Sequence, residues 1–157
     1  MSVYNDAAAF RKSAFGSLVS KAYTPLAVET KVLFNVSDLC IITAIFGVVT
    51  TRISVAGTSK LQFNPTLASA VTTDLVAATD LGTTDTEVGS LLSFDGIRAS
   101  SIQYVGAAGG GGVPMLQRPI AVPAGAIEQV NATGADGGIT WYLTYVAVID
   151  GATIAAA

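Results

Sequence analysis

The side chains best suited to chemistry in this sequence are four carboxylates in a Thr- and Gly-rich stretch. Asp74, Asp80, Asp85 and Glu87 lie in and around the segment TDLGTTDTE. Carboxylate and hydroxyl oxygens that converge on one point bind hard cations such as Ca²⁺. The ligand spacing of an EF-hand is missing, however, and Asp in Thr- and Gly-rich segments is typical of turns. We therefore predict solvated turns and no metal site.

Two carboxylates can also catalyse hydrolysis. Asp85 with Glu87 or Asp95 is the candidate pair, although no feature of the sequence singles it out. Histidine is absent, which excludes Ser-His-Asp and Cys-His nucleophiles and argues against zinc. The segment AAGGGG (107–112) lacks the lysine of a phosphate-binding loop, and the single Cys40 lies in an apolar run typical of a core. We predict no enzyme, no catalytic residue and no cofactor.

The composition points instead to contact with other protein. Charged residues make up 12% of the 157 residues, against about 25% in ordinary soluble domains, and hydrophobic residues make up 51%. The net charge of −3 argues against a nucleic-acid partner. The longest apolar run, residues 39–49, is about half the length of a membrane-spanning helix, which needs about 20 residues. We expect neither nucleic acid nor membrane as a partner, and much surface buried against protein.

Two regions with different patterns position these residues. Residues 1–24 are Ala-rich, and Asn5 is the expected capping residue of a helix within them. Their apolar residues recur at helical spacing: Phe10, Ala14 and Leu18, with Phe15 and Val19 alongside. This pattern predicts an N-terminal arm that is an amphipathic helix or a partly ordered strap and that ends near Pro25. Residues 1–27 also carry a basic excess of two. Residues 25–157 show short β-branched segments between turn signals, which predict a mainly β domain, a β-sandwich or jelly roll.

Two of the expected strands are apolar on both faces. In GGITWYLTYVAVIDGATI (137–154), Trp141, Leu143 and Tyr145 would point one way, and Tyr142, Val146 and Val148 the other. In residues 40–55, Ile41, Ile45, Val49 and Ile53 would oppose Ile42, Phe46 and Val48. One face of each strand should fill the core, and the other should contact a partner. The pattern does not decide which face does which.

Two segments carry a resemblance to a known family. VSDLCIITAIFGVVTTRISVAGTSKLQFNPT and RPIAVPAGAIEQVNATGADGGITWYLTYVAVIDGATIAAA share a low-charge, Thr-, Ala-, Gly- and Val-rich style. In this style and in its strand order, the chain over residues 28–157 resembles the capsid decoration (cement) proteins and other small structural virion proteins of tailed bacteriophages. The resemblance implies a homo-oligomer, often a trimer at local threefold positions, that clamps the major capsid protein on the capsid exterior. It brings no catalytic residues.

We therefore expect a structural virion protein that self-associates as a trimer and stabilises the capsid lattice. The expected interface residues are Phe10, Phe15, Leu18, Tyr142, Val146 and Val148. The alternative is a host-glycan-binding module of a tail or head fibre, which would use Tyr104, Trp141 and Tyr142, because aromatic rings also stack on sugars.

Overall fold

The computed structural model describes residues 12, 14, 16–67, 69, 71–97, 99–104 and 118–157. Within these ranges the chain forms the strands β1 (Ser17–Tyr23), β2 (Thr30–Val36), β3 (Cys40–Thr51), β4 (Thr58–Pro65), β5 (Thr73–Asp74), β6 (Thr79–Asp80), β7 (Leu91–Ser93), β8 (Gln103–Tyr104), β9 (Ile120–Val122), β10 (Gly125–Asn131), β11 (Gly138–Ala147) and β12 (Ile154–Ala156). The mainly β fold predicted from the sequence is confirmed. No helix in these ranges is long and apolar enough to span a bilayer.

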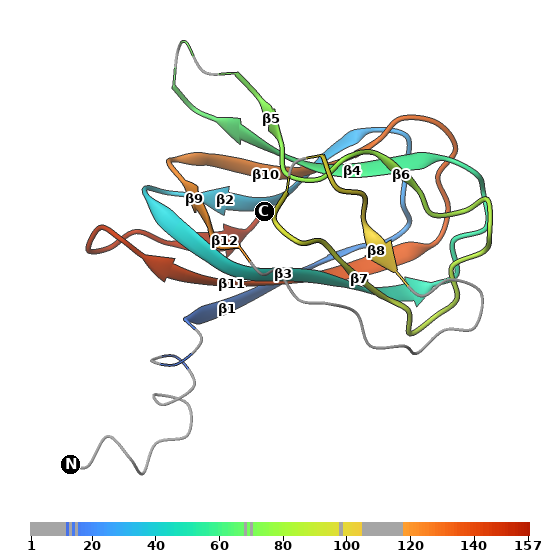
Figure 1. The fold of residues 1–157 in the computed structure, drawn as a ribbon, viewed down its shortest axis with the longest axis horizontal. Helices are drawn as coiled ribbons and strands as arrows, with labels where there is room; N and C mark the ends of the chain where they lie inside the picture. Colours follow the sequence, from blue (N-terminus) through green and yellow to red (C-terminus); the bar gives the residue numbers. More distant parts are fainter. Residues whose placement is uncertain are drawn as a thin grey trace.

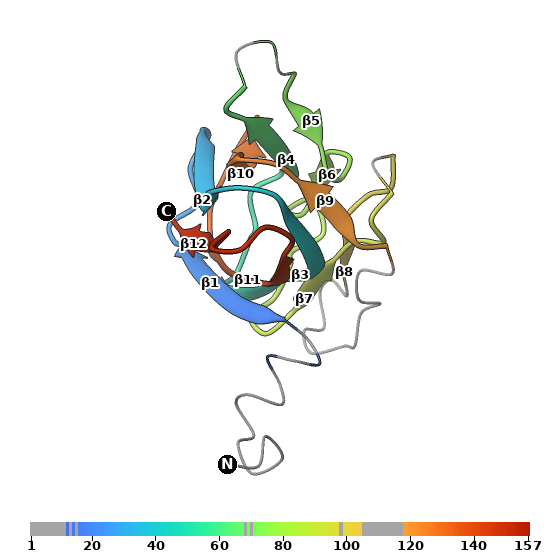
Figure 2. The same ribbon diagram turned by 90° about the vertical axis from the view of Figure 1, so that its left-hand side faces the viewer.

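The strands form two antiparallel sheets that pack face to face (Figure 1). Sheet A has the order β1-β11-β3-β7-β8, with β9 also paired to β3. Sheet B has the order β12-β2-β10-β4-β5, with β6 also paired to β4. Strands far apart in sequence are neighbours, as with β1 and β11 or β2 and β10. The end view in Figure 2 shows β1 and β12, the edge strands of the two sheets, side by side. The architecture is the predicted β-sandwich.

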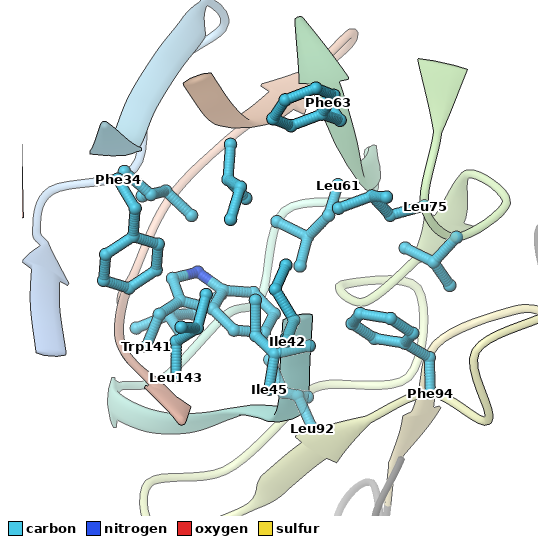
Figure 3. Close-up of a cluster of buried hydrophobic side chains, with 14 of the residues drawn as sticks. Phe34, Ile42, Ile45, Leu61, Phe63, Leu75, Leu92, Phe94, Trp141 and Leu143 are labelled. Carbon is cyan, nitrogen blue, oxygen red and sulfur yellow. The ribbon is translucent and has the colours of Figure 1, made fainter. Parts of the chain in front are cut away.

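The core fills the space between the sheets (Figure 3). Sheet A contributes Trp141, Leu143, Ile42, Ile45 and Leu92, and sheet B contributes Phe34, Leu61 and Phe63. In β11 the buried positions alternate with half-buried ones, as expected for a strand with one face in the core. The face of Trp141, Leu143 and Tyr145 is therefore the core face. This result decides between the two faces that the sequence left open.

A β-bulge changes the pattern expected for β3. The pairing with β11 shifts between Thr144 and Tyr145, so that Thr144 pairs with Ala44 but Tyr145 pairs with Ile42. The extra residue on β3 turns both Ile42 and Ile45 into the core, where each is fully buried. The prediction that Ile45 and Ile42 lie on opposite faces was wrong, because a bulge breaks the strict alternation on which it rested.

The N-terminal region also differs from the prediction. Lys12 and Ala14 are helical, and the Gly16 N–H donates to the Lys12 carbonyl oxygen over 3.0 Å. Gly16 has φ +85°, the left-handed conformation that commonly ends a helix. Residues 17–23 then form β1, which pairs with β11 along its whole length. The arm therefore ends at Gly16 and the sandwich begins at Ser17, not at residue 25. Phe10 and Phe15 lie outside the described residues.

Candidate interaction surface

One side of the sandwich carries an uncharged surface on the outside of sheet A. Its residues alternate with the buried ones on three neighbouring strands. They are Leu18, Ser20 and Ala22 of β1, Thr140, Tyr142 and Thr144 of β11, and Ala44, Phe46 and Val48 of β3. We call these nine residues the outer face of sheet A. They include no ionisable acid or base except the Tyr142 phenol. The β1 residues are exposed and the others half-buried.

The centre of this face is an aromatic pair. Tyr142 and Phe46 occupy paired positions on β11 and β3. Their ring centroids lie 5.2 Å apart, and the ring planes are within 15° of parallel. Paired aromatic rings on adjacent strands contribute about 0.2–1 kcal/mol to the stability of the sheet, relative to two alanines at the same positions. Ser20 is the β1 residue paired with Tyr142, so the stack is bordered by a small hydroxyl. The result is a low aromatic ridge between small side chains.

The outside of sheet B has a different chemistry. Glu128 lies there among polar neighbours, and its two carboxylate oxygens accept hydrogen bonds from the Gln62 amide, over 2.7 Å, and the Asn64 amide, over 3.1 Å. Lys60 and Asp74 form an ion pair on the same sheet, with the Lys60 Nζ 2.6 Å from a carboxylate oxygen. These polar groups on the outside of sheet B therefore have partners within the subunit. The outer face of sheet A differs in having no charged side chain.

The outer face of sheet A continues into exposed aliphatic residues at one end of the sandwich. Val146 and Val148, at and after the end of β11, are 46% and 50% exposed. Leu18 at the start of β1 is 65% exposed. A cavity of about 310 Å³ lies beside them, lined by residues that include Gly16, Tyr145 and Val146. Four of the predicted interface residues lie in the described ranges. Leu18, Val146 and Val148 are accessible, and Tyr142 is half-buried on β11, the strand next to β1.

Two further exposed aliphatic residues were not predicted as contact residues. Leu67 and Val71, in the connection between β4 and β5, are 66% and 80% exposed. This connection extends away from the sandwich at the upper left of Figure 1. The available signal was the uncharged segment PTLASAVTT, in which apolar residues flank small ones.

Trp141 is not available for stacking on a sugar. Its side chain is 1% exposed, and its Nε1–H donates to the Gln129 Oε1 over 2.8 Å. Gln129 in turn donates to Asn131, which also accepts from Ser59 over 2.6 Å. These bonds connect β11 in sheet A to β10 and β4 in sheet B. The predicted glycan role of Trp141 is therefore wrong, because the indole is a core group whose polar edge is satisfied internally.

The other two residues predicted for glycan binding are not brought together with Trp141. Tyr104 belongs to β8, and its side chain is outside the described set. Tyr142 lies on the opposite face of β11 from Trp141 and covers Phe46. Trp141 and Tyr142 of β11 thus serve different surfaces.

Among the carboxylates of the candidate catalytic and metal sites, Asp85 and Glu87 share one cation, whereas Asp80 has its own turn donors. Arg52 forms ion pairs with Asp85 and, over 3.2 Å, with Glu87. The Thr83 hydroxyl, with the Thr83 and Gly82 N–H groups, lowers the pKa of Asp80 to about 2. The described residues contain no group of three or more His, Cys, Asp or Glu side chains placed to hold a metal.

Two more carboxylates close loops in the same way. The Ile97 N–H donates to Asp95 over 2.8 Å, the main cause of a lowered pKa of Asp95, and the Ser100 hydroxyl also donates. Burial alone would raise the pKa of Asp136, but hydrogen bonds from Ser54 and Val55 outweigh it and lower that pKa. Such groups are ionised at neutral pH and act as turn acceptors. Asp95 does not share a partner with Asp85 or Glu87.

Comparison with known protein families, curated proteins and solved structures gave no match. The best-defined feature available for function is the uncharged outer face of sheet A with the exposed aliphatic end beside it.

Proposed function

We propose that this protein is a structural component of a tailed-bacteriophage virion. In this proposal it self-associates as a trimer on the capsid exterior and cements the lattice of the major capsid protein. The observation that carries the self-association is the outer face of sheet A, which combines an aromatic ridge with no charged group. Its place on a capsid rests on the resemblance described above.

The physical basis of self-association is burial of this face. Apolar area removed from water contributes roughly 25 cal/mol per Å². Association costs about 4–15 kcal/mol in lost freedom of the partners. Roughly 800 Å² per subunit is the usual size of a stable contact, and the nine residues of the face account for part of that area. The accessible residues Val146 and Val148, which adjoin the face, supply more.

A cement protein acts by binding the assembled lattice more tightly than free capsid subunits. A ligand that binds only one state stabilises that state by mass action. Each copy of a cement protein bound to the shell therefore makes the assembled shell harder to disrupt. Such a role needs a rigid, pre-formed subunit. The sandwich fits this need because its two sheets are joined by apolar packing and by the bond between Trp141 and Gln129.

The first test is the mass of the purified chain in solution. Size-exclusion chromatography with light scattering should give about three times the chain mass of 15.9 kDa. The mass should fall toward that of one chain when Tyr142→Lys places a charge beside Phe46. Asn35→Lys, at an exposed position on the outside of sheet B, is the matched control and should leave the mass unchanged. A wild-type chain that stays monomeric at all concentrations would contradict the proposal.

The second test concerns the particle. Cryo-electron microscopy of particles that carry this protein should show it outside the capsid at repeated positions. Particles that lack it should release their DNA at a lower temperature. If the protein instead lies at a fibre tip, the cement role is wrong, and glycan-array binding would then test the fibre alternative.

A further inference from the structure

Three Asp–Gly pairs occur in the chain, at residues 95–96, 136–137 and 150–151. In such a pair the backbone can react with the aspartate side chain, because glycine has no side chain to shield its N–H or to restrict the backbone. The three glycines have nearly the same conformation, with φ of +81° at Gly96 and Gly137 and +85° at Gly151. A difference in reactivity among the pairs therefore has to come from the surroundings of each aspartate.

The reaction rearranges the backbone and uses water alone. The glycine nitrogen bonds to the aspartate Cγ, and one carboxyl oxygen leaves as water with its own proton and the proton of the N–H, which gives a cyclic succinimide. Water then adds to one of the two ring carbonyls and breaks its bond to nitrogen. Opening at Cγ restores aspartate, and opening at the backbone carbonyl leaves the chain linked through Cγ, as isoaspartate. The carboxyl group must therefore be able to turn toward the glycine nitrogen.

Asp136 cannot turn in this way without losing several hydrogen bonds. The N–H groups of Ser54 and Val55 donate to one of its carboxylate oxygens, each over 2.9 Å, and the Ser54 hydroxyl donates to the other over 2.6 Å. Gly137 is closely packed as well, because a Cβ added to it would collide with the Arg52 carbonyl oxygen. The fold thus locks both members of this pair.

Asp95 is held at both carboxylate oxygens too. One accepts from the Ile97 N–H over 2.8 Å, and the other accepts from the Ser100 hydroxyl over 2.9 Å. The Ile97 bond is also the main cause of a lowered pKa of Asp95. A smaller fraction of its carboxyl groups therefore carries the proton that leaves with the water.

Asp150 has neither restraint. Asp150 and Gly151 lie in the connection between β11 and β12, and both are exposed. The Ala152 N–H donates to the Ile149 carbonyl oxygen over 3.0 Å, so the pair occupies the two central positions of a β-turn. In the described part of the chain, no hydrogen bond or ion pair holds the Asp150 carboxylate, and a Cβ added to Gly151 would meet no atom within 4 Å. This carboxyl group can turn toward the glycine nitrogen without losing a partner.

We propose that Asp150–Gly151 is a site of spontaneous isoaspartate formation in the folded protein, and that the fold protects the other two Asp–Gly pairs. The rearranged link adds a carbon atom to the backbone and turns the former backbone carbonyl into the carboxylate. The change falls next to the exposed residues Val148 and Ile149, so it alters the shape of this end of the sandwich and keeps its charge. The reaction needs no second subunit and is therefore independent of the proposed self-association.

Ageing of the purified full-length chain in neutral buffer tests this site. Samples are kept folded, or unfolded in guanidinium chloride, and are digested after increasing times with chymotrypsin, which cuts between Asp136 and Asp150 at the aromatic residues of β11. Mass spectrometry with electron-transfer fragmentation distinguishes isoaspartate from aspartate in each peptide. Ageing in heavy-oxygen water also marks the ring openings that restore aspartate, because the added oxygen comes from the solvent. The unfolded chain gives a reference rate for each pair.

In the folded chain, Asp150 should form isoaspartate at a rate close to its own reference. Asp95 and Asp136 should react at least about tenfold more slowly than their references, because breaking one hydrogen bond to a charged group slows a step by about that factor. The matched control is Asp150→Glu, which keeps the charge at this exposed position but closes such a ring far more slowly. In this variant the heavy oxygen should no longer enter the peptide that contains residue 150.

Two results would overturn the assignment. In one, folding slows Asp150 as much as it slows Asp95 and Asp136, which would mean that the turn is as restrained as the other two sites. In the other, the three pairs of the folded chain react at one common rate, which would mean that the hydrogen bonds give no protection. Neither result depends on the mass of the protein in solution, so the proposed self-association is tested separately.

Discussion

The bond between Trp141 and Gln129 connects the two sheets through the middle of the core, and Gln129→Leu tests its contribution. Gln129 is fully buried on β10 and accepts from the Trp141 Nε1–H over 2.8 Å. Its own amide donates to Asn131 over 3.0 Å. Leucine has a similar size but can neither accept from the indole nor donate to Asn131.

The expected loss follows from counting the groups left without partners. A buried donor without an acceptor costs about 1–3 kcal/mol, and the lost bond to Asn131 adds about 1 kcal/mol. The Asn131 oxygen retains the Ser59 hydroxyl as a donor. We therefore expect Gln129→Leu to lower the free energy of unfolding by about 2–4 kcal/mol, partly offset by the apolar side chain. Since a domain has about 5–15 kcal/mol in total, the variant should still fold.

The assay uses urea unfolding followed by two signals. Trp141 is the single tryptophan, so its fluorescence reports directly on the bonded site, and far-ultraviolet circular dichroism reports on the strands. The denaturation midpoint should fall by roughly 1–2 M urea without a large change in slope. Because association raises apparent stability, each variant is measured at several protein concentrations.

A double-mutant cycle with Trp141→Phe separates the bond from the effects of size. Phenylalanine has no N–H, so Gln129→Leu should cost at least about 1 kcal/mol less in that background. The Trp141→Phe variants are followed by circular dichroism alone. If Gln129→Leu is neutral or stabilising in both backgrounds, apolar packing outweighs the buried hydrogen bonds, and the assigned role of this network is wrong.

Three further predictions concern single positions. The pKa of Asp80 is lowered to about 2 from 3.8 by Thr83 and Gly82, so its contribution to stability is present above about pH 4 and lost as the pH falls toward 2; Asp80→Asn should flatten the dependence of Tm on pH in this window, and an unchanged dependence would contradict the assignment. Gly16→Ala should destabilise by about 1–3 kcal/mol, because it combines φ +85° with a Cβ 2.3 Å from a backbone oxygen, and a midpoint within error of wild type would show that the helix end can rearrange. Burial, with a smaller effect of Asp38, raises the pKa of the Cys40 thiol, so a thiol reagent should label the folded chain far more slowly than the chain in urea; equal rates would mean that β3 opens readily.

The alternation in β11 was predictable from sequence, but the choice of core face was not. Both faces carry aromatic and β-branched residues, so hydrophobicity alone is nearly symmetrical. The choice depends on sheet B, where Gln129 supplies an acceptor for the indole of Trp141. That acceptor comes from another strand twelve residues away in sequence, and no pattern within β11 indicates it.

The errors in the first fifty residues have local causes. In β3 a single extra residue near Ala44 reverses the expected facing of Ile42, and bulges have no simple sequence signature. At the N-terminus, Gly16 is a helix stop signal that the spacing of Phe10, Ala14 and Leu18 obscured. Leu18 fits this helical spacing, yet it lies on the outer face of β1. Its apolar side chain does not distinguish the two structures, because a strand also tolerates apolar residues at its exposed positions.

In the proposed assembly, the outer face of sheet A also has to be compatible with a free subunit. Large exposed apolar patches and flat strand surfaces promote aggregation. This face limits that tendency by composition, since Ser20, Thr140 and Thr144 place hydroxyls among the apolar groups, and Tyr142 and Phe46 cover part of each other. Hydroxyls are hydrated in the free subunit but cost less than charges when a partner covers them. A charge here would keep the monomer soluble at the expense of the contact, whereas more Leu or Ile would favour indiscriminate association. Hence substitutions on this face should change assembly with little effect on unfolding of the subunit, while Gln129→Leu on the other side of the sandwich core should do the reverse.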